Sequence, residues 1–229
     1  WSGTILSIAF KKFEQPEIPY LEKPEMDALL AAPDQKTPQG WRDHAVLLFA
    51  YNTGARASEI AHVLIGDLQL PASPDARSAF VALHGKGSKI RLCPLWPDTA
   101  RVLKTLIAGR GGDQHVFINR CARPITRFGI HAVVERYAAQ IAKKLPGLDA
   151  KRVSPHTIRH TSATHLLQAG VDINTIRAWL GHVSINTTNV YAQIDVKMKA
   201  NVLAELEPTV KSLSHRGGGS DLMLFLAAL

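Results

Sequence analysis

The sequence has few of the residues that would point to a secreted, metal-binding or membrane protein. It has two cysteines, Cys93 and Cys121, which are too few for a disulfide framework and which form no pair with the spacing of metal ligands. No apolar run approaches the roughly 18 residues of a membrane span, and the N-terminal residues lack the pattern of a cleavable signal. These absences favour a protein of the reducing cytoplasm with no membrane segment.

The sequence also lacks the patterns of two common kinds of phosphate chemistry. No glycine-rich loop of the Walker type follows a strand and opens a helix, because the segment 85–87 falls in a predicted hairpin turn. No cluster of acidic residues suggests the ligands of a two-metal nuclease. We therefore expect neither a metal nor a cofactor.

The composition that remains is that of a globular, basic protein. The chain has 229 residues, of which 46% are hydrophobic and 20% charged, so it can bury a sizeable core. Its 27 Lys and Arg residues outnumber 19 Asp and Glu residues and give a formal net charge of +8. This charge makes a polyanion such as nucleic acid the leading class of partner. Because the chain begins at Trp1 without Met, we expect it to be part of a longer protein.

Hydrophobic periodicity predicts a mainly α fold with one small antiparallel β-sheet, an α+β class. A period near 3.6, with capping residues, predicts helices over about 24–30, 41–53, 56–65, 98–108, 126–145, 154–170 and 172–181, one beginning at Ser184, and one over 195–206. The period falls to two in residues 79–84 and 89–95, on either side of a glycine-rich turn. This pattern predicts a β-hairpin.

Four places in the chain hold polar residues that the predicted helices and turns do not require. They are the segment 53–59, the hairpin tip at Lys86, the segment 156–160, and the segment 180–182 followed by Tyr191. Arginines in the first and third of these can each hold a phosphate with two parallel N–H bonds. Together the four places supply a nucleophile, acids, bases and positive charges, a set suited to phosphoryl transfer without a metal.

These motifs resemble those of the tyrosine recombinase, or phage integrase, family, and the Xer-type recombinases in particular. The motifs occur in order as Thr-Gly-Ala-Arg (53–56) with Glu59, Gly-Lys-Gly-Ser-Lys (85–89), His-Thr-Ile-Arg-His (156–160), Leu-Gly-His (180–182) and Tyr191. The intervals of 23 residues from Arg159 to His182 and of nine from His182 to Tyr191 are those that the family usually shows. The resemblance covers about residues 20–197 and implies the fold of the family's catalytic domain.

The resemblance implies a role for each catalytic residue. Tyr191 would attack a scissile DNA phosphate and form a 3′-phosphotyrosyl bond, while Arg56 and Arg159 would hold the non-bridging oxygens. Lys86 would protonate the leaving 5′-oxygen. His156 would help to remove the tyrosine proton, because a phenol with a pKa of about 10 is a poor nucleophile at neutral pH.

Three further residues complete the implied site. His182 would donate a hydrogen bond to the phosphate, and Glu59 and His160 would orient the residues that touch it. A 5′-hydroxyl of a second duplex would then reverse the chemistry without ATP or a metal. The expected partners are a double-stranded DNA recombination site and further copies of the chain, which would act as a tetramer through a Holliday junction.

The resemblance also suggests how the chain is divided. Residues 1–22 show no clear period and are predicted to be a linker or arm, and residues 23–207 are predicted to be the catalytic domain. Residues 208–229 combine a flexible linker, 217–220, with an apolar terminal helix, 221–229. That helix would either pack on its own domain or, as we slightly favour, dock on a neighbouring subunit.

Several alternatives remain at this point. A type IB topoisomerase uses a similar residue set, although the Thr-Gly-Ala-Arg and Leu-Gly-His segments favour a recombinase. A non-catalytic DNA-binding protein on the same fold is a further alternative, and the intact set of motifs argues against it. Lys89 is a rival to Lys86 as the acid, and Tyr191 taken alone would more often be a packing residue.

Overall fold

The computed structural model describes residues 19–71, 79–85, 87, 89–145, 147, 148 and 151–181. All of them belong to the first of two compact units, residues 1–195. Lys86, His182 and Tyr191 lie outside the described residues, as do the two helices expected after Ser184, the tail and most of the N-terminal arm.

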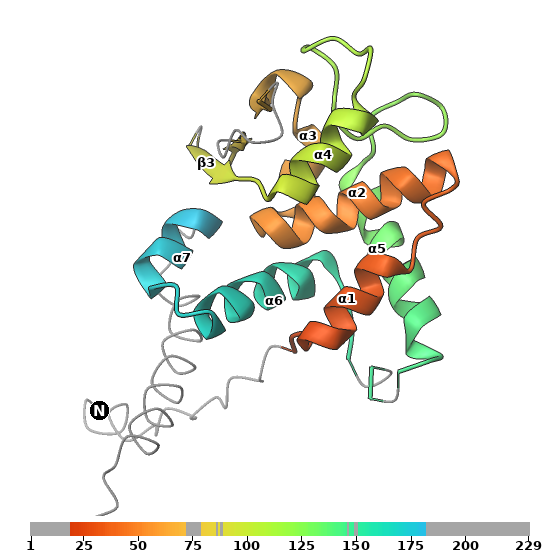
Figure 1. The fold of residues 1–229 in the computed structure, drawn as a ribbon, viewed down its shortest axis with the longest axis vertical. Helices are drawn as coiled ribbons and strands as arrows, with labels where there is room; N and C mark the ends of the chain where they lie inside the picture. Colours follow the sequence, from red (N-terminus) through yellow and green to blue (C-terminus); the bar gives the residue numbers. More distant parts are fainter. Residues whose placement is uncertain are drawn as a thin grey trace, which may run out of the picture. The chain divides into compact units, whose positions relative to one another are not determined.

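The described residues form a mainly helical fold with one small sheet, which confirms the predicted fold class (Figure 1). The helices are α1 (Lys23–Ala31), α2 (Pro38–Thr53), α3 (Ala57–His62), α4 (Pro97–Leu106), α5 (Arg127–Ala142), α6 (Pro155–Gln168) and α7 (Ile173–Leu180). A 3₁₀ turn, η2 (Ile65–Asp67), precedes the strands β1 (Leu68–Gln69), β2 (Phe80–His84) and β3 (Ile90–Pro94).

Capping residues determine where several of these helices begin and end. The side chains of Ser154 and Asp172 accept hydrogen bonds from backbone N–H groups in the first turns of α6 and α7, as the sequence predicts. Helix α2 begins three residues before the predicted start, because Thr37 caps it and Pro38 occupies its first turn. It ends at Gly54, which has the left-handed φ of 58° that favours glycine.

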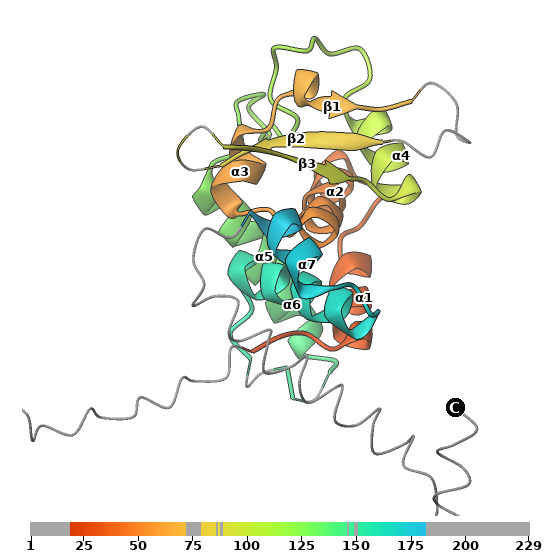
Figure 2. The same ribbon diagram turned by 90° about the vertical axis from the view of Figure 1, so that its left-hand side faces the viewer.

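The sheet has the antiparallel order β1-β2-β3, and the predicted hairpin is its β2-β3 part (Figure 2). The two-residue strand β1, which pairs with the start of β2, is not predicted from the sequence. The helix predicted over 56–65 ends instead at His62. Beyond it, Val63 and Leu64 pair with the backbone of the apolar run that begins at His115.

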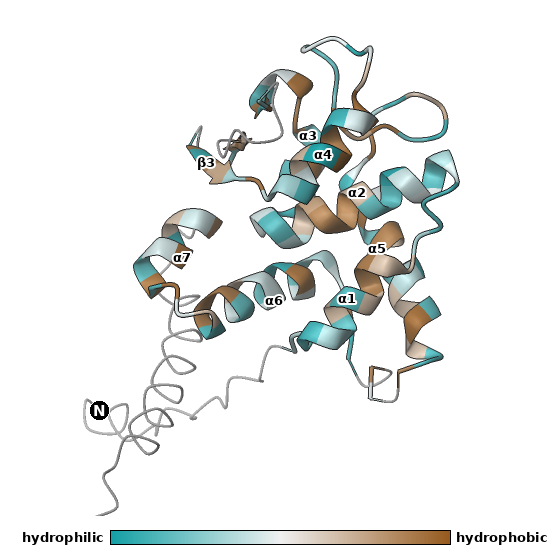
Figure 3. Cartoon of the chain, in the orientation of Figure 1, coloured by the Kyte–Doolittle hydropathy of each residue, from teal (hydrophilic) through white to brown (hydrophobic). Residues whose placement is uncertain are grey.

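Helix α2 lies at the centre of the core and contacts α1, α3, α4, α5 and α6. Its residues from Ala45 to Thr53 are all buried, and Figure 3 shows apolar residues along its middle. Phe49 packs edge-to-face against Phe117, with ring centroids 5.4 Å apart. Leu21 is also fully buried, and its N–H donates to Thr161 of α6, so the core includes residues before α1.

The polar end of α2 is anchored by one buried carboxylate. Asp43 is fully buried and accepts hydrogen bonds from Arg42, from Arg136 and from the hydroxyl of Tyr137. These contacts tie α2 to α5.

Among the described residues, no helix is both long and apolar enough to cross a membrane.

Truncation of Phe49, one member of the core aromatic pair, tests this packing. We expect Phe49→Ala to lower the free energy of unfolding by about 3–5 kcal/mol, because it removes a fully buried ring and leaves a cavity. The matched control is Phe128→Ala, whose ring is 69% exposed, and it should change stability by about 0.5 kcal/mol or less. The measurement is urea denaturation of both variants, and equal losses in the two would show that Phe49 is not a core residue.

Candidate functional site

The first part of the site forms at the junction between α2 and α3. Arg56 is the residue before α3, and Glu59 is the third residue of that helix. One oxygen of the Glu59 carboxylate accepts the backbone N–H of Arg56 at 2.8 Å, and the other accepts its Nη1 at 2.9 Å. The acidic residue thus caps its own helix, as a Glu at this position commonly does. The Glu59 side chain is 4% exposed, whereas that of Arg56 is 43% exposed.

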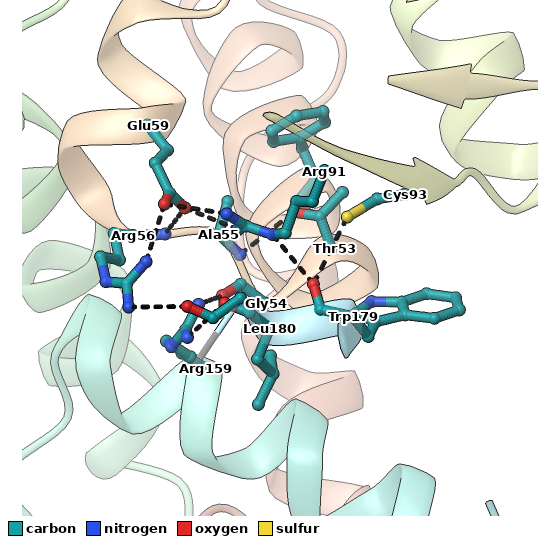
Figure 4. Close-up of polar contacts among 12 residues, drawn as sticks. Thr53, Gly54, Ala55, Arg56, Glu59, Arg91, Cys93, Arg159, Trp179 and Leu180 are labelled. Atoms are coloured by element: carbon teal, nitrogen blue, oxygen red, sulfur yellow. Dashed lines mark hydrogen bonds and ion pairs between the residues drawn. The ribbon is translucent and has the colours of Figure 1, made fainter. Parts of the chain in front are cut away.

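Arg91 of β3 grips the same carboxylate from the other side (Figure 4). Its Nη1 and Nη2 donate to the two oxygens of Glu59 at 2.9 and 2.7 Å, a bidentate ion pair. Its Nε donates to the carbonyl of Trp179, in the last turn of α7, at 2.9 Å. One guanidinium therefore joins β3, α3 and α7.

The two arginines control the ionisation of Glu59. Burial by itself would raise the pKa of the Glu59 carboxyl, but hydrogen bonds from Arg91 and then from Arg56 lower that pKa to about 2. Burial would in turn lower the pKa of Arg91, and its bonds to Glu59 more than reverse this effect. Glu59 and Arg91 are therefore both charged at neutral pH.

Arg159 of α6 enters the site from below this cluster and is almost fully buried. Its Nη1 donates to the carbonyl of Gly54, and its Nη2 donates to the carbonyl of Leu180 at 2.6 Å. Glycine is required at position 54 for a second reason: a Cβ there would lie 2.3 Å from Leu180 Cδ2. The C-terminal ends of α2 and α7 thus meet at Arg159.

The last turn of α7 is held by arginines from three different elements. The carbonyls of Trp179, Leu180 and Gly181 accept from Arg91, Arg159 and Arg56, respectively, the last at 3.5 Å. Cations are favourable at the C-terminal end of a helix, where unpaired carbonyls carry partial negative charge. Positive charge therefore gathers beside Gly181, the residue that precedes His182 in the sequence.

His156 and His160, two of the three histidines of α6, lie in different surroundings. His156 is exposed, and its pKa is lowered by partial burial and then by the positive charges of Arg159 and Arg56. His160 is buried, and its ring makes an edge contact with that of Tyr20. The charge of His156 is therefore sensitive to both site arginines.

Comparison with known proteins decides the family. The sequence profile of the phage integrase family matches residues 19–198. The chain belongs to the phage integrase family of tyrosine recombinases.

Its relatives in this family include named recombinases. The chain is 37% identical over 227 residues to y4rC of Sinorhizobium fredii, named as a candidate integrase/recombinase, covering 98% of this chain and 67% of that protein. It is 36% identical over 188 residues to the tyrosine recombinase XerD of Xanthomonas axonopodis pv. citri, covering 76% and 58%. The chain thus spans 58–67% of the length of these two relatives.

Solved structures show the same fold. The XerA recombinase aligns over 85% of this chain and 67% of its own, with a TM-score of 0.66 and 22% identity. A XerH recombinase in a post-cleavage complex with its difH substrate aligns over 82% and 53%, with a TM-score of 0.65 and 21% identity. The helices and small sheet described above are therefore the catalytic-domain fold of this family.

The structure of this phage integrase family member brings together only part of the predicted site. Arg56, Glu59 and Arg159 converge, and His156 lies within electrostatic reach of both arginines. Lys86, His182 and Tyr191 are outside the described residues. The rival Lys89 is exposed, and its carbonyl accepts the N–H of Gly85 to close the hairpin. Within the described ranges, no group of three or more acidic, His or Cys side chains could hold a metal ion.

Sequence reasoning missed Arg91, although one signal for it was present. In β3, Arg91 is two residues from the buried Cys93, so both side chains lie on the face of the strand that packs on the core. A charged residue on a buried face usually has a charged partner. The pattern could therefore have predicted a buried ion pair, although not that Glu59 completes it.

The Glu59 cluster predicts a specific dependence of stability on pH. Because the pKa of Glu59 falls from 4.5 to about 2 on folding, its carboxylate stabilises the fold above pH 4.5, and this contribution is lost as the pH falls towards 2. At pH 7, Glu59→Gln should lower the free energy of unfolding by about 2–4 kcal/mol. The difference from the wild type should shrink in acid.

Denaturant unfolding of both proteins from pH 7 to pH 3 measures this effect. Glu135→Gln, on the exposed face of α5, is the matched control and should leave the stability unchanged to within about 0.5 kcal/mol. A difference between wild type and Glu59→Gln that stays constant down to pH 3 would contradict the assigned ion pairs.

Proposed function

We propose that the chain is the catalytic domain of a site-specific DNA recombinase that breaks and rejoins strands through a covalent 3′-phosphotyrosyl intermediate. The observation that carries the proposal is the convergence of Arg56 and Arg159, from two separate motifs, on the last turn of α7. Membership of the phage integrase family and the recombinase relatives supply the reaction class. The DNA complexes among the similar structures support DNA as the partner.

The charge balance of the site suits a phosphodiester. Arg56, Arg91 and Arg159 contribute three positive charges, and Glu59 contributes one negative charge, so the cluster is cationic. Among these four side chains, Arg56 is the most exposed, so a phosphate can reach it without rearrangement of the core. The buried Arg159 would contact the phosphate by exchanging one of its bonds to a backbone carbonyl for a bond to a non-bridging oxygen. Arginines that are already fixed by the protein stabilise a developing charge without reorganisation.

The proposed reaction consists of strand cleavage followed by strand rejoining. The Tyr191 oxygen attacks the phosphorus, its proton passes to His156, and the bond from phosphorus to the 5′-oxygen breaks. Lys86 donates the proton that this oxygen takes up, while Arg56 and Arg159 hold the non-bridging oxygens and His182 donates a hydrogen bond to them. Attack by a 5′-hydroxyl of a second duplex reverses these steps and releases Tyr191.

Two of the three described tyrosines, Tyr51 and Tyr137, are unsuited to be the nucleophile, which supports Tyr191. The chain has four tyrosines. Tyr51 is buried, donates or accepts a hydrogen bond with His165, and has its pKa raised by burial to about 12. Tyr137 donates to the buried Asp43, and burial raises its pKa too. Both are held in the core with their protons, which makes them poor nucleophiles.

The remaining expectations belong to the same proposal. Residues 23–207 would act as the catalytic domain, Glu59 and His160 would orient the residues that contact the phosphate, and four copies would assemble on DNA in the cytoplasm. The apolar helix 221–229 would dock on a neighbouring subunit.

A nicked DNA substrate tests the reaction. A pool of duplexes with a randomised window beside a nick is incubated with the protein, denatured, and searched for DNA joined to protein through a 3′-phosphate. We expect an enriched sequence and a covalent complex with the wild type and with the control Tyr51→Phe, and none with Tyr191→Phe.

Two outcomes would contradict the proposal. One is a covalent complex that survives in Tyr191→Phe. The other is relaxation of supercoiled plasmid that lacks the enriched sequence, because that result indicates a topoisomerase.

The dependence of cleavage on pH tests His156 as the base. Because burial and the two arginines lower the pKa of His156, its neutral form persists in weak acid. We expect the rate on the enriched substrate to fall only below pH 6.5, the ordinary value for histidine, and His156→Gln to slow cleavage by about 100-fold and remove this limb. A limb that is unchanged in His156→Gln would rule out His156 as the titrating group.

A further inference from the structure

Arg91 occupies a position that no other described arginine shares. It bonds to Glu59, which also bonds to Arg56, and to the carbonyl of Trp179. Trp179 lies three residues before His182 in the sequence. Its side chain is 11% exposed, so it is too enclosed to be a general DNA-contacting residue. These three hydrogen bonds go to groups that hold other parts of the site.

The backbone around Arg91 is shaped to admit the guanidinium. Gly181 ends α7 with a left-handed φ of 63°, and a Cβ there would lie 3.2 Å from Arg91 Cδ and 3.3 Å from Nη1. Any side chain at position 181 would therefore be in unfavourably close contact with the side chain of Arg91. The close approach requires glycine for two independent reasons, its conformation and the space it leaves.

The base of the β2-β3 hairpin also lies beside this ion pair. A Cβ at Gly85 would lie 3.8 Å from Glu59 Oε1 and 4.0 Å from Arg91 Nη1. The N–H of Gly85 donates to the carbonyl of Lys89 at 2.8 Å and closes the hairpin at this point. Lys86 follows Gly85 in the sequence, so the segment that carries the proposed acid begins at the Glu59–Arg91 pair.

We propose that Arg91 is a positioning residue that fixes, relative to one another, the three segments from which Arg56, Lys86 and His182 extend. This inference rests on the proposed function. Lysine cannot replace arginine here, because the bonds to two carboxylate oxygens and to a carbonyl require three N–H donors in a fixed planar arrangement. The ammonium group of a lysine would keep the positive charge beside Glu59 but would lose the hydrogen bond to the carbonyl of Trp179 in α7.

The variant Arg91→Lys separates positioning from charge. With the enriched nicked substrate, we expect single-turnover formation of the covalent complex to slow by about 100-fold, because small displacements of reacting groups have effects of that size. The dissociation constant for the same DNA should change by less than about twofold, since the proposal gives the enclosed Arg91 no contact with the DNA. The matched control is Arg101→Lys on α4, which alters an exposed ion pair with Asp98 and should leave both quantities unchanged.

A purely structural role predicts a different pattern. If Arg91 only stabilises the fold, the rate and the DNA affinity fall together in proportion to the unfolded fraction, or the lysine variant cleaves at the wild-type rate. Either result would overturn the proposal.

Amide hydrogen exchange tests the tie to α7 without DNA, so it remains decisive even if the wild type forms no covalent complex and the proposed function fails. We expect exchange at residues 179–181 to be about tenfold faster in Arg91→Lys than in Arg101→Lys, with exchange in the middle of α2 unchanged. Equal exchange at residues 179–181 in the two variants would overturn the positioning role.

Discussion

The site depends on one buried carboxylate, that of Glu59. A charge in this position is unfavourable unless it is paired, and here it is paired twice, by Arg56 and by Arg91. Removal of either arginine leaves the other to satisfy a carboxylate that can no longer be solvated. The carboxylate therefore enforces a particular placement of both guanidinium groups.

The bonds of the arginines also connect α3 to the last turn of α7. Arg91 and Arg159 each donate to a carbonyl in the last turn of α7, and Arg159 also donates to Gly54, so the ends of α2 and α7 are joined. Four segments that are far apart in the sequence thus meet around one cluster of charges. In the function proposed above, the exposed Arg56 receives the phosphate while these bonds hold the local fold around it.

Sequence reasoning predicted much of this, and its failures have physical causes. The helix boundaries at Ser154, Asp172, Gly54 and Gly181 were predictable because capping is a local property of the chain. Strand β1 was not, because two residues show no period and the strand exists only through its pairing with β2. The convergence of Arg56 and Arg159 on α7, and the partner of Arg91, depend on tertiary packing and leave no local pattern.

The coupling between Glu59 and Arg91 is the most direct test of this account. A double-mutant cycle with Glu59→Gln, Arg91→Met and the combined variant, read by denaturant unfolding at pH 7, isolates that coupling from the separate effects of each change. The account predicts that the double variant is more stable than the sum of the single losses implies, by about 2–3 kcal/mol, because each single change leaves a buried charge with fewer partners. Additive losses, with a coupling of about 0.5 kcal/mol or less, would contradict it.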